Sequence, residues 1–186
     1  SVMGNLVLQK GVNSYNGCLD TYIDSTSANW GNSERMTICG YADQGIGNVQ
    51  RGLIKFDVSS LAGKSISKAT LSLFSYNDSQ RKGSTGFYGA YKITSDWVYN
   101  QCNWTLAKTG VNWITGGGDF LADPDATAPK QGVAQVWYDF DVTTRVQSWI
   151  ANGGVDNYGW LIKCTDENLH NQDWLYQSDT SNASKR

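Results

Sequence analysis

Charged residues, proline and histidine are all scarce in this chain of 186 residues. Lys, Arg, Asp and Glu together make up 17% of it, the formal net charge is −2, and there are 2 prolines and 1 histidine. A nucleic-acid-binding surface normally needs a clear excess of basic residues, so this balance argues against one. No apolar run approaches the roughly 20 residues that cross a bilayer as a helix. The hydrophobic content of 40% also excludes a disordered acidic tail.

The cysteines are not arranged for zinc, because no Cys-x-x-Cys pair occurs and histidine is almost absent. Cys18, Cys39, Cys102 and Cys164 form an even set, which allows three pairings in an oxidising compartment. Cys18 and Cys39 fall on two strands predicted on either side of a turn. Their parity would place both sulfur atoms on one face of a hairpin. We therefore predict a Cys18–Cys39 disulfide, which leaves Cys102 and Cys164 as the second pair.

Glycine and aromatic residues are abundant, with 20 Gly, 8 Trp and 10 Tyr, a composition typical of strands joined by turns. Apolar and polar residues alternate with period two in several segments, namely 51–58, 68–76, 86–93, 135–141 and 157–164. Such alternation indicates half-buried strands. Shorter strand candidates are 5–9, 19–24, 36–40 and 174–177. The sequence thus predicts an all-β domain.

Two segments depart from the alternation. Residues 142–152 carry Val142, Val146 and Trp149 at helical spacing, and we predict a short helix there that covers one end of a β-sandwich. Residues 94–131 show weak periodicity and include three consecutive glycines, so we predict a long loop.

Two aspartates each follow the end of a strand, Asp57 before Val58-Ser59 and Asp141 before Val142-Thr143. The simplest interpretation is that each carboxylate caps the following turn, with metal ligation or catalysis as the alternatives. Asp139 and Asp141 share a strand face about 7 Å apart, a separation that would suit glycoside hydrolysis. Asp141 already has a capping role, and the single histidine, His170, lies in the polar segment Leu169-His170-Asn171. We therefore expect no catalytic activity from this chain.

Aromatic and basic residues with outward parity are the candidates for binding a ligand. Polysaccharide-binding proteins present aromatic rings to sugar faces and polar groups to hydroxyls. The candidate ligand-binding residues are Trp137, Tyr88, Tyr76, Lys55, Lys92 and Trp113, with Phe74 also on the outward parity. An aromatic and basic face would suit polymers of uronic acids. The alternative is that the outward aromatics pack beneath the 94–131 segment, and parity does not decide between the two.

A set of motifs along the chain resembles a known family. They are residues 8–12, 20–25, 29–31, Leu-Ile-Lys-Phe-Asp-Val-Ser-Ser-Leu at 53–61, 69–73, Trp97, Trp104, Phe-Asp-Val-Thr at 140–143, 146–149, 157–159 and the region of Ser178. In this order they resemble the DNRLRE domain, also called the disaggregatase-related repeat, which overlaps carbohydrate-binding module family 96. The resemblance covers nearly the whole chain, so we expect one domain over residues 1–186.

The resemblance implies a secreted jelly-roll β-sandwich at the cell surface or outside the cell. Its implied role is a non-catalytic carbohydrate-binding module for polysaccharides, including acidic ones. A structural calcium ion is also implied, with Asp20 and Asp24 as the oxygen-rich candidates, although both can equally form turns.

The family pattern continues after the Ser178 region with a final alternating strand. We expect this strand to be missing or supplied by another chain, leaving a slot beside Ile54, Phe56 or Tyr91. Strand exchange of this kind would suit the alternative role of a structural subunit of a surface layer or filament. A polysaccharide lyase or hydrolase is the remaining interpretation. No membrane span and no nucleic-acid partner are expected.

Overall fold

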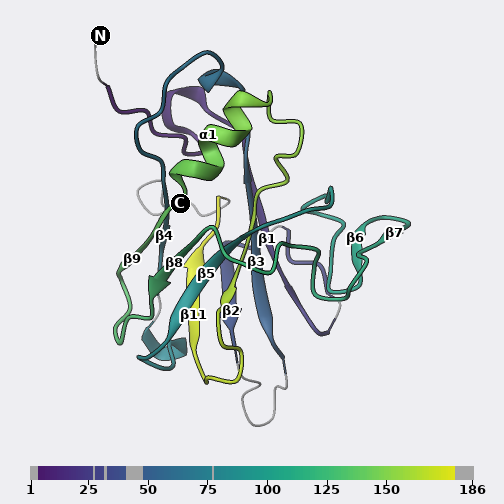
Figure 1. The fold of residues 1–186 in the computed structure, drawn as a ribbon. Helices are drawn as coiled ribbons and strands as arrows, with labels where there is room; N and C mark the ends of the chain where they lie inside the picture. The colour runs from purple at the N-terminus through teal and green to yellow at the C-terminus, as the bar shows by residue number, and fades with distance from the viewer. Residues whose placement is uncertain (1–3, 27, 32, 41–47, 77, 179–186) are drawn as a thin grey trace.

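The computed structural model describes residues 4–26, 28–31, 33–40, 48–76 and 78–178, and they form a β-sandwich with a single α-helix among them (Figure 1). The strands are β1 (Cys18–Asp24), β2 (Arg35–Cys39), β3 (Gln50–Phe56), β4 (Thr70–Phe74), β5 (Phe87–Lys92), β6 (Leu106–Lys108), β7 (Val111–Asn112), β8 (Ala126–Pro129), β9 (Trp137–Asp141), β10 (Trp160–Cys164) and β11 (Gln172–Tyr176). The helix α1 covers Thr143–Ala151, and three 3-10 turns are η1 (Val12–Ser14), η2 (Ser59–Leu61) and η3 (Asp78–Gln80). The all-β prediction is confirmed.

The strands form two layers. The first layer has the order β1-β3-β10-β5-β8, and all its pairs are antiparallel. The second layer contains the pairs β9-β4 and β11-β2. The bridge between Ser75 and Leu175 joins these two pairs, with the Tyr76 N–H donating to the Trp174 carbonyl at 3.1 Å.

One sheet passes from the first layer into the second at the start of β3. There Cys39 of β2 pairs with Gln50 of β3. β2 therefore lies along the same edge of β3 as β10, which pairs with β3 from Gly52 onward. Gly52 allows this approach, because a Cβ atom at that position would clash with the side chain of Met36 and lie 3.1 Å from Cδ1 of Ile38. The β2–β11 ribbon continues from this junction over the core.

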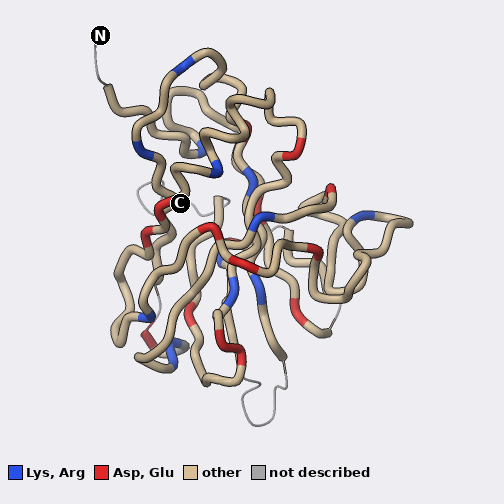
Figure 2. Tube along the Cα trace, viewed as in Figure 1, with Lys and Arg blue, Asp and Glu red and all other residues tan. Residues whose placement is uncertain are grey.

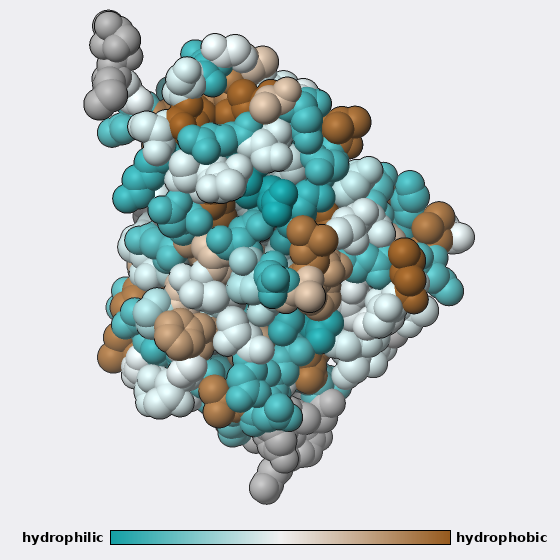
Figure 3. Space-filling model, viewed as in Figure 1, coloured by the Kyte–Doolittle hydropathy of each residue, from teal (hydrophilic) through white to brown (hydrophobic). Residues whose placement is uncertain are grey.

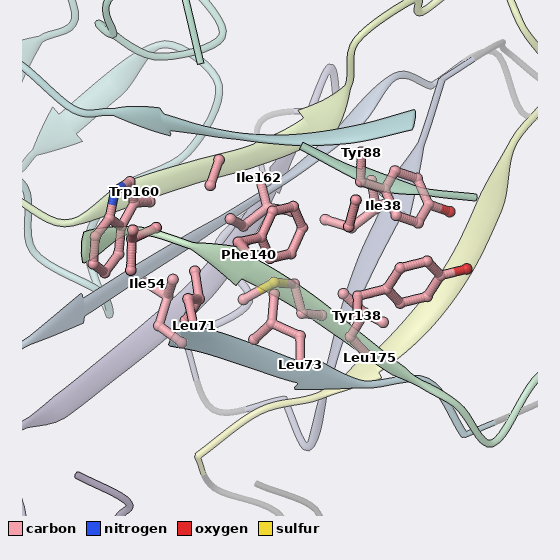
Figure 4. Close-up of a cluster of buried hydrophobic side chains, with 14 of the residues drawn as sticks. Ile38, Ile54, Leu71, Leu73, Tyr88, Tyr138, Phe140, Trp160, Ile162 and Leu175 are labelled. Atoms are coloured by element: carbon pink, nitrogen blue, oxygen red, sulfur yellow. The ribbon is translucent and has the colours of Figure 1, made fainter. Parts of the chain in front are cut away.

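The core lies between the two layers and, except on β5, follows the predicted alternation (Figure 4). Its buried side chains come from both layers, among them Ile54, Tyr88, Trp160 and Ile162 on one side and Leu71, Leu73, Tyr138, Phe140 and Leu175 on the other. Burying such side chains contributes roughly 1.5–3 kcal/mol each relative to exposure. This apolar contact is what holds the layers together.

The predicted parity of β5 is wrong. Tyr88 is fully buried between the layers, whereas Phe87, expected inside, is 47% exposed. Tyr91 and Ile93 share the parity of Phe87 and face the outer side of the first layer, where they are buried as well. Because both faces of β5 are buried, apolar character alone did not show which face was the core.

Residues 94–131 are not a simple loop, because they contain β6, β7 and β8 and cover the outer face of the first layer. They form a second hydrophobic cluster with the sheet, made of Ile23, Leu53, Ile93, Trp97, Cys102, Ala107, Trp113 and Leu161. The indole N–H groups of Trp97 and Trp113 donate to the Tyr158 and Asn103 carbonyls at 2.6 and 2.8 Å. The segment is therefore an integral second core.

The helix prediction is confirmed, with α1 at Thr143–Ala151 against the expected 142–152. Asp141 accepts a hydrogen bond from the Thr143 N–H at 3.1 Å, and Asp57 accepts one from the Ser59 N–H at 2.8 Å. Both aspartates thus have the capping role expected from the sequence. Trp149 is buried on the inner face of the helix, with its ring centroid 4.8 Å from that of Trp160.

The predicted open strand slot is occupied. β1 pairs with β3 over its whole length and lies beside Ile54 and Phe56. β8 pairs with β5 up to Ala90, and the bridge Ile93–Phe120 extends this edge past Tyr91. The slot was placed wrongly because the positions of β1 and β8 in the sheet depend on long-range pairing. Any strand within residues 179–186 lies outside the described residues.

We expect Trp149→Ala to lower the free energy of unfolding by about 3–5 kcal/mol, because it leaves a cavity beneath α1. Chemical denaturation at 25 °C measures this loss. The control is Val155→Ala just beyond the helix, where Val155 is 75% exposed and a change within about 0.5 kcal/mol is expected. A loss below about 1 kcal/mol for Trp149→Ala would show that the helix does not stabilise the sandwich.

Candidate functional site

Aromatic side chains form a row across the outer face of the second layer. We call this row the aromatic ladder, and it consists of Trp137 on β9, Phe74 and Tyr76 on and after β4, and Tyr176 and Trp174 on β11. Alternation places them there, since Tyr138, Leu73 and Leu175 point into the core. Adjacent strands then bring the outward residues side by side.

The rings of the aromatic ladder are in continuous contact. The Phe74 ring centroid lies 5.0 Å from that of Trp137, edge to face, and 6.1 Å from that of Tyr176 in a stacked arrangement. Tyr76 stacks on Tyr176 at 4.4 Å and lies 6.0 Å from Trp174. Such contacts fix the rings in place and contribute roughly 0.5–1.5 kcal/mol per pair beyond their buried area.

Arg35 of β2 ends the ladder. Its guanidinium carbon lies 3.6 Å from the Trp174 ring centroid, a cation–π contact. Trp137, at the other end, is 44% exposed, while Tyr76, Trp174 and Arg35 are half-buried. Stacking on neighbours leaves these side chains partly accessible and already ordered.

Beside the ladder, Asp139 and Asp141 point outward on β9. The Ser72 hydroxyl donates a hydrogen bond to Asp139 at 2.6 Å. Asp141 accepts hydrogen bonds from both the N–H and the hydroxyl of Thr143. These hydrogen bonds lower the pKa of Asp141. Both carboxylates are exposed and are hydrogen-bonded to neighbouring side chains of the same layer.

The structure divides the predicted ligand-binding residues among different places. Trp137 and Tyr76 come together on the ladder. Tyr88 and Trp113 are buried, so their assignment to a ligand surface is wrong. Tyr88 faces the inter-layer core, and Trp113 belongs to the second cluster under 94–131. Trp113 therefore follows the alternative stated in the sequence analysis, in which an aromatic residue is buried by the 94–131 segment.

Lys55 and Lys92 lie on the first layer, away from the ladder. Lys92 is buried and its Nζ lies 3.4 Å from Asp156. Lys55 Nζ lies 4.0 Å from Asp96 and 5.5 Å from the Trp97 ring centroid. The expectation of one shared aromatic and basic face is therefore wrong, because the two sets of residues occupy different layers.

Three residues of the site were not predicted, namely Trp174, Tyr176 and Arg35. The sequence held a signal for the first two, since Trp174 and Tyr176 alternate with Leu175 in the short strand candidate 174–177. A strand of this length gives too few alternations to assign a face. Arg35 could not be linked to Trp174 without the β2–β11 register.

Asp20 and Asp24 do not form a common metal site. They lie four residues apart on β1, about 13 Å by strand rise. Asp20 accepts hydrogen bonds from the N–H and hydroxyl of Ser178 at 2.7 and 2.6 Å, and Asp24 accepts from the N–H of Thr26 at 2.9 Å. Across the described parts of the chain, no three His, Cys, Asp or Glu side chains converge on a metal position. The two carboxylates therefore cannot bind one common ion, and a structural calcium ion stays a prediction.

The predicted Cys18–Cys39 disulfide is also wrong. Cys18 pairs with Phe56 at one end of β3, and Cys39 pairs with Gln50 at its other end, about 20 Å away by strand rise. A disulfide requires Cα atoms within about 7 Å. β2 therefore does not form the expected hairpin with β1, and all four cysteines are buried thiols.

A groove of about 510 Å³ opens at the helix end of the sandwich, between β1, β3 and α1. Its lining includes Lys55 and Asp57 together with the apolar Leu19 and Trp149. The groove is thus separate from the ladder, and of the predicted ligand-binding residues it contains Lys55 but not Trp137 or Tyr76.

Charged and hydrophobic residues are distributed over the described part of the chain. Acidic and basic residues are interspersed along the trace (Figure 2), and hydrophobic residues form small separate patches on the face in view (Figure 3). No helix in the described ranges has the length and apolarity needed to cross a membrane.

The fold and the ladder define a β-sandwich domain with an aromatic outer surface. The family model of the disaggregatase related repeat domain matches residues 31–186, and the chain belongs to this family. This match confirms the resemblance inferred from the sequence motifs. No curated protein matches the chain.

We expect the four cysteines to react as thiols once the protein is unfolded without reductant. In the folded protein, burial raises the pKa of Cys102 and Cys164 to about 12. At pH 8 roughly one part in ten thousand of each is then thiolate, so labelling should be slow until unfolding restores the ordinary pKa. Counting labelled thiols with and without denaturant measures both effects. Fewer than four reactive thiols in the unfolded, unreduced chain would contradict the structure.

Proposed function

We propose that this chain is a non-catalytic, extracellular domain that binds polysaccharide along the aromatic ladder. The observation that carries the proposal is the continuous row of rings from Trp137 to Trp174 across one sheet face. The apolar faces of sugar rings stack on such side chains, while hydroxyls bind neighbouring polar groups.

The shape of the ladder favours a chain over a single sugar. It runs across the strands from β9 to β11 and ends at Arg35 on β2, about 14 Å at the usual strand spacing. Phe74 in the middle of the row is only 6% exposed, so the exposed Trp137 and the half-buried Tyr76, Tyr176 and Trp174 are the rings that can contact sugar units. Because the rings already stack on one another, binding requires little further ordering of side chains.

Arg35 supports a preference for acidic sugars. Its guanidinium is half-buried against Trp174 and always charged, so it can pair with a carboxylate of a uronate. Serine and aspartate at the Trp137 end offer hydroxyl and carboxylate groups to neutral sugars. The proposed ligand is therefore an acidic polysaccharide that lies along the ladder and places a carboxylate beside Arg35 on β2.

A binding role is better supported than cleavage. Glycoside hydrolysis needs one carboxyl group as acid and another as base or nucleophile. Asp139 and Asp141 are instead exposed and hydrogen-bonded to Ser72 and Thr143, and the hydrogen bonds from Thr143 keep the pKa of Asp141 low. A carboxyl group with a lowered pKa is a poor general acid at neutral pH.

We expect Trp137→Ala and Trp174→Ala each to weaken binding by about 10-fold, or about 1.4 kcal/mol. Titration calorimetry with polygalacturonate, alginate and a neutral glucan measures this. The matched control is Phe87→Ala, because Phe87 is 47% exposed but lies on the first layer. Trp137→Ala should leave the melting temperature nearly unchanged.

Arg35→Gln distinguishes acidic from neutral ligands. It should weaken binding of the uronates, and added salt should weaken wild-type binding of the same polymers. Binding of a neutral glucan should be insensitive to both. Equal affinities of the wild type, Trp137→Ala and Trp174→Ala for every polymer that binds would rule out the ladder as the site.

A further inference from the structure

A buried lysine and a buried aspartate meet between the two layers. Lys130 follows β8 in the first layer, and Asp173 lies in β11 of the second. The Lys130 Nζ atom is 3.0 Å from Oδ2 of Asp173, and the two side chains are 0% and 1% exposed. Neither residue belongs to the ladder or was singled out by the sequence.

The amine of Lys130 is held by two backbone carbonyls. Its Nζ donates to the Gln131 carbonyl at 2.7 Å and to the Gly83 carbonyl at 3.1 Å. A neutral amine has two N–H groups and one lone pair. In the neutral amine, N–H groups donated to both carbonyls would leave the lone pair on the side of Asp173, whose Oδ2 is the third acceptor around Nζ.

The two carboxyl oxygens of Asp173 have different surroundings. Oδ2 accepts hydrogen bonds from the Tyr88 hydroxyl at 2.6 Å and the Tyr138 hydroxyl at 3.0 Å. Oδ1 is buried without a hydrogen-bond partner. Burial and the neighbouring carboxylate raise the pKa of Tyr88 well above its usual value, so its hydroxyl stays protonated and remains a donor.

An ion pair is a costly state for this site. Taking both charges out of water costs several kcal/mol, which is recovered only when the remaining polar atoms are satisfied. The unpartnered Oδ1 leaves part of that cost in place. Burial lowers the pKa of Lys130 and raises that of Asp173, and both shifts favour the neutral amine and the neutral acid.

We propose that Lys130 and Asp173 condense to an intramolecular isopeptide bond. The Nζ lone pair attacks Cγ of Asp173, one N–H proton moves to Oδ2, and Oδ2 leaves with its own proton as water. Oδ1 becomes the amide carbonyl oxygen, and no oxidant, cofactor or further reactant is consumed.

The site supplies what this condensation needs. Lysine amines desolvated in apolar surroundings are known nucleophiles, and holding two reactants at contact distance is equivalent to a very high local concentration. The Tyr88 and Tyr138 hydroxyls donate hydrogen bonds to the leaving oxygen and can stabilise negative charge that develops on it. The single N–H of the amide product keeps one of the two carbonyl acceptors.

The bond would join the two layers covalently. It connects the end of β8 to β11 and closes the intervening chain, with β9, α1 and β10, into a ring. A cross-link of this type restricts the unfolded chain as a disulfide does, without depending on redox conditions.

Intact-mass measurement of the purified wild-type chain is the first test. We expect a mass lower than that of the sequence by one water molecule, and a wild-type mass equal to the sequence would overturn the proposal. Trypsin should then yield one branched peptide that joins residues 109–145 to residues 164–185, with no cleavage after Lys130. A mass loss mapped to any other residues would equally refute the bond.

Variants separate the cross-link from a simple buried ion pair. Lys130→Met should show the mass of its own sequence and melt at lower temperature, whereas Lys64→Met, at an exposed lysine, should keep the loss of water. Asp173→Asn should lose ammonia in place of water, since the side-chain nitrogen of asparagine can leave as ammonia in the same attack. A Lys130→Met variant that still lost water would contradict the assignment to this lysine.

Discussion

The packing of residues 94–131 on the outer face of the first layer determines which aromatic side chains of this chain remain accessible. That segment buries Trp97 and Trp113 against Leu53 and Leu161, so the first layer has apolar contacts on both faces. In the second layer, outward aromatics pack mainly on one another, and Trp137 stays 44% exposed. Two sheets with similar alternation therefore have different roles, one sealed and one available to a ligand.

The ladder is ordered before any ligand arrives, and this has a physical basis. Outward rings on adjacent strands lie close enough to stack, which removes much of their rotational freedom in the unbound protein. Arg35 adds a cation at one end by stacking on Trp174, and its position is fixed by the β2–β11 register. In the proposed binding mode, affinity for an extended polymer would depend on shape and spacing rather than on a deep pocket.

One cluster of buried polar groups lies between the layers around Asp173. The carboxyl group of Asp173 accepts hydrogen bonds from the Tyr88 and Tyr138 hydroxyls and contacts Nζ of Lys130. These interactions connect β5, β9 and the end of β8 to β11. A half-satisfied buried network is costly when its members are charged. The proposed amide at this position would remove both charges and replace the contact between Lys130 and Asp173 with a covalent link between the layers.

The strand-forming character of the chain could be read from its sequence, as could α1 and the capping roles of Asp57 and Asp141. These features depend on local alternation, helical spacing and hydrogen bonds between near neighbours. The outward position of Trp137 and Tyr76 followed from the same local rule. The failures were Tyr88, Trp113, the Cys18–Cys39 pair and the strand slot, and each of them depended on which distant segment lies beside which strand.

The sequence by itself determined the family, α1, and the position and apolar parity of most strands outside residues 94–131, because these are carried by neighbours along the chain. Only the tertiary structure decided which face of each layer is covered and which strands are adjacent. It alone placed Trp174 and Arg35 beside Tyr76, and Lys130 against Asp173, since contacts between residues far apart in sequence arise from sheet order and register. A period-two pattern shows which side chains of a strand share a face. Whether that face is buried depends on the segments that pack over it.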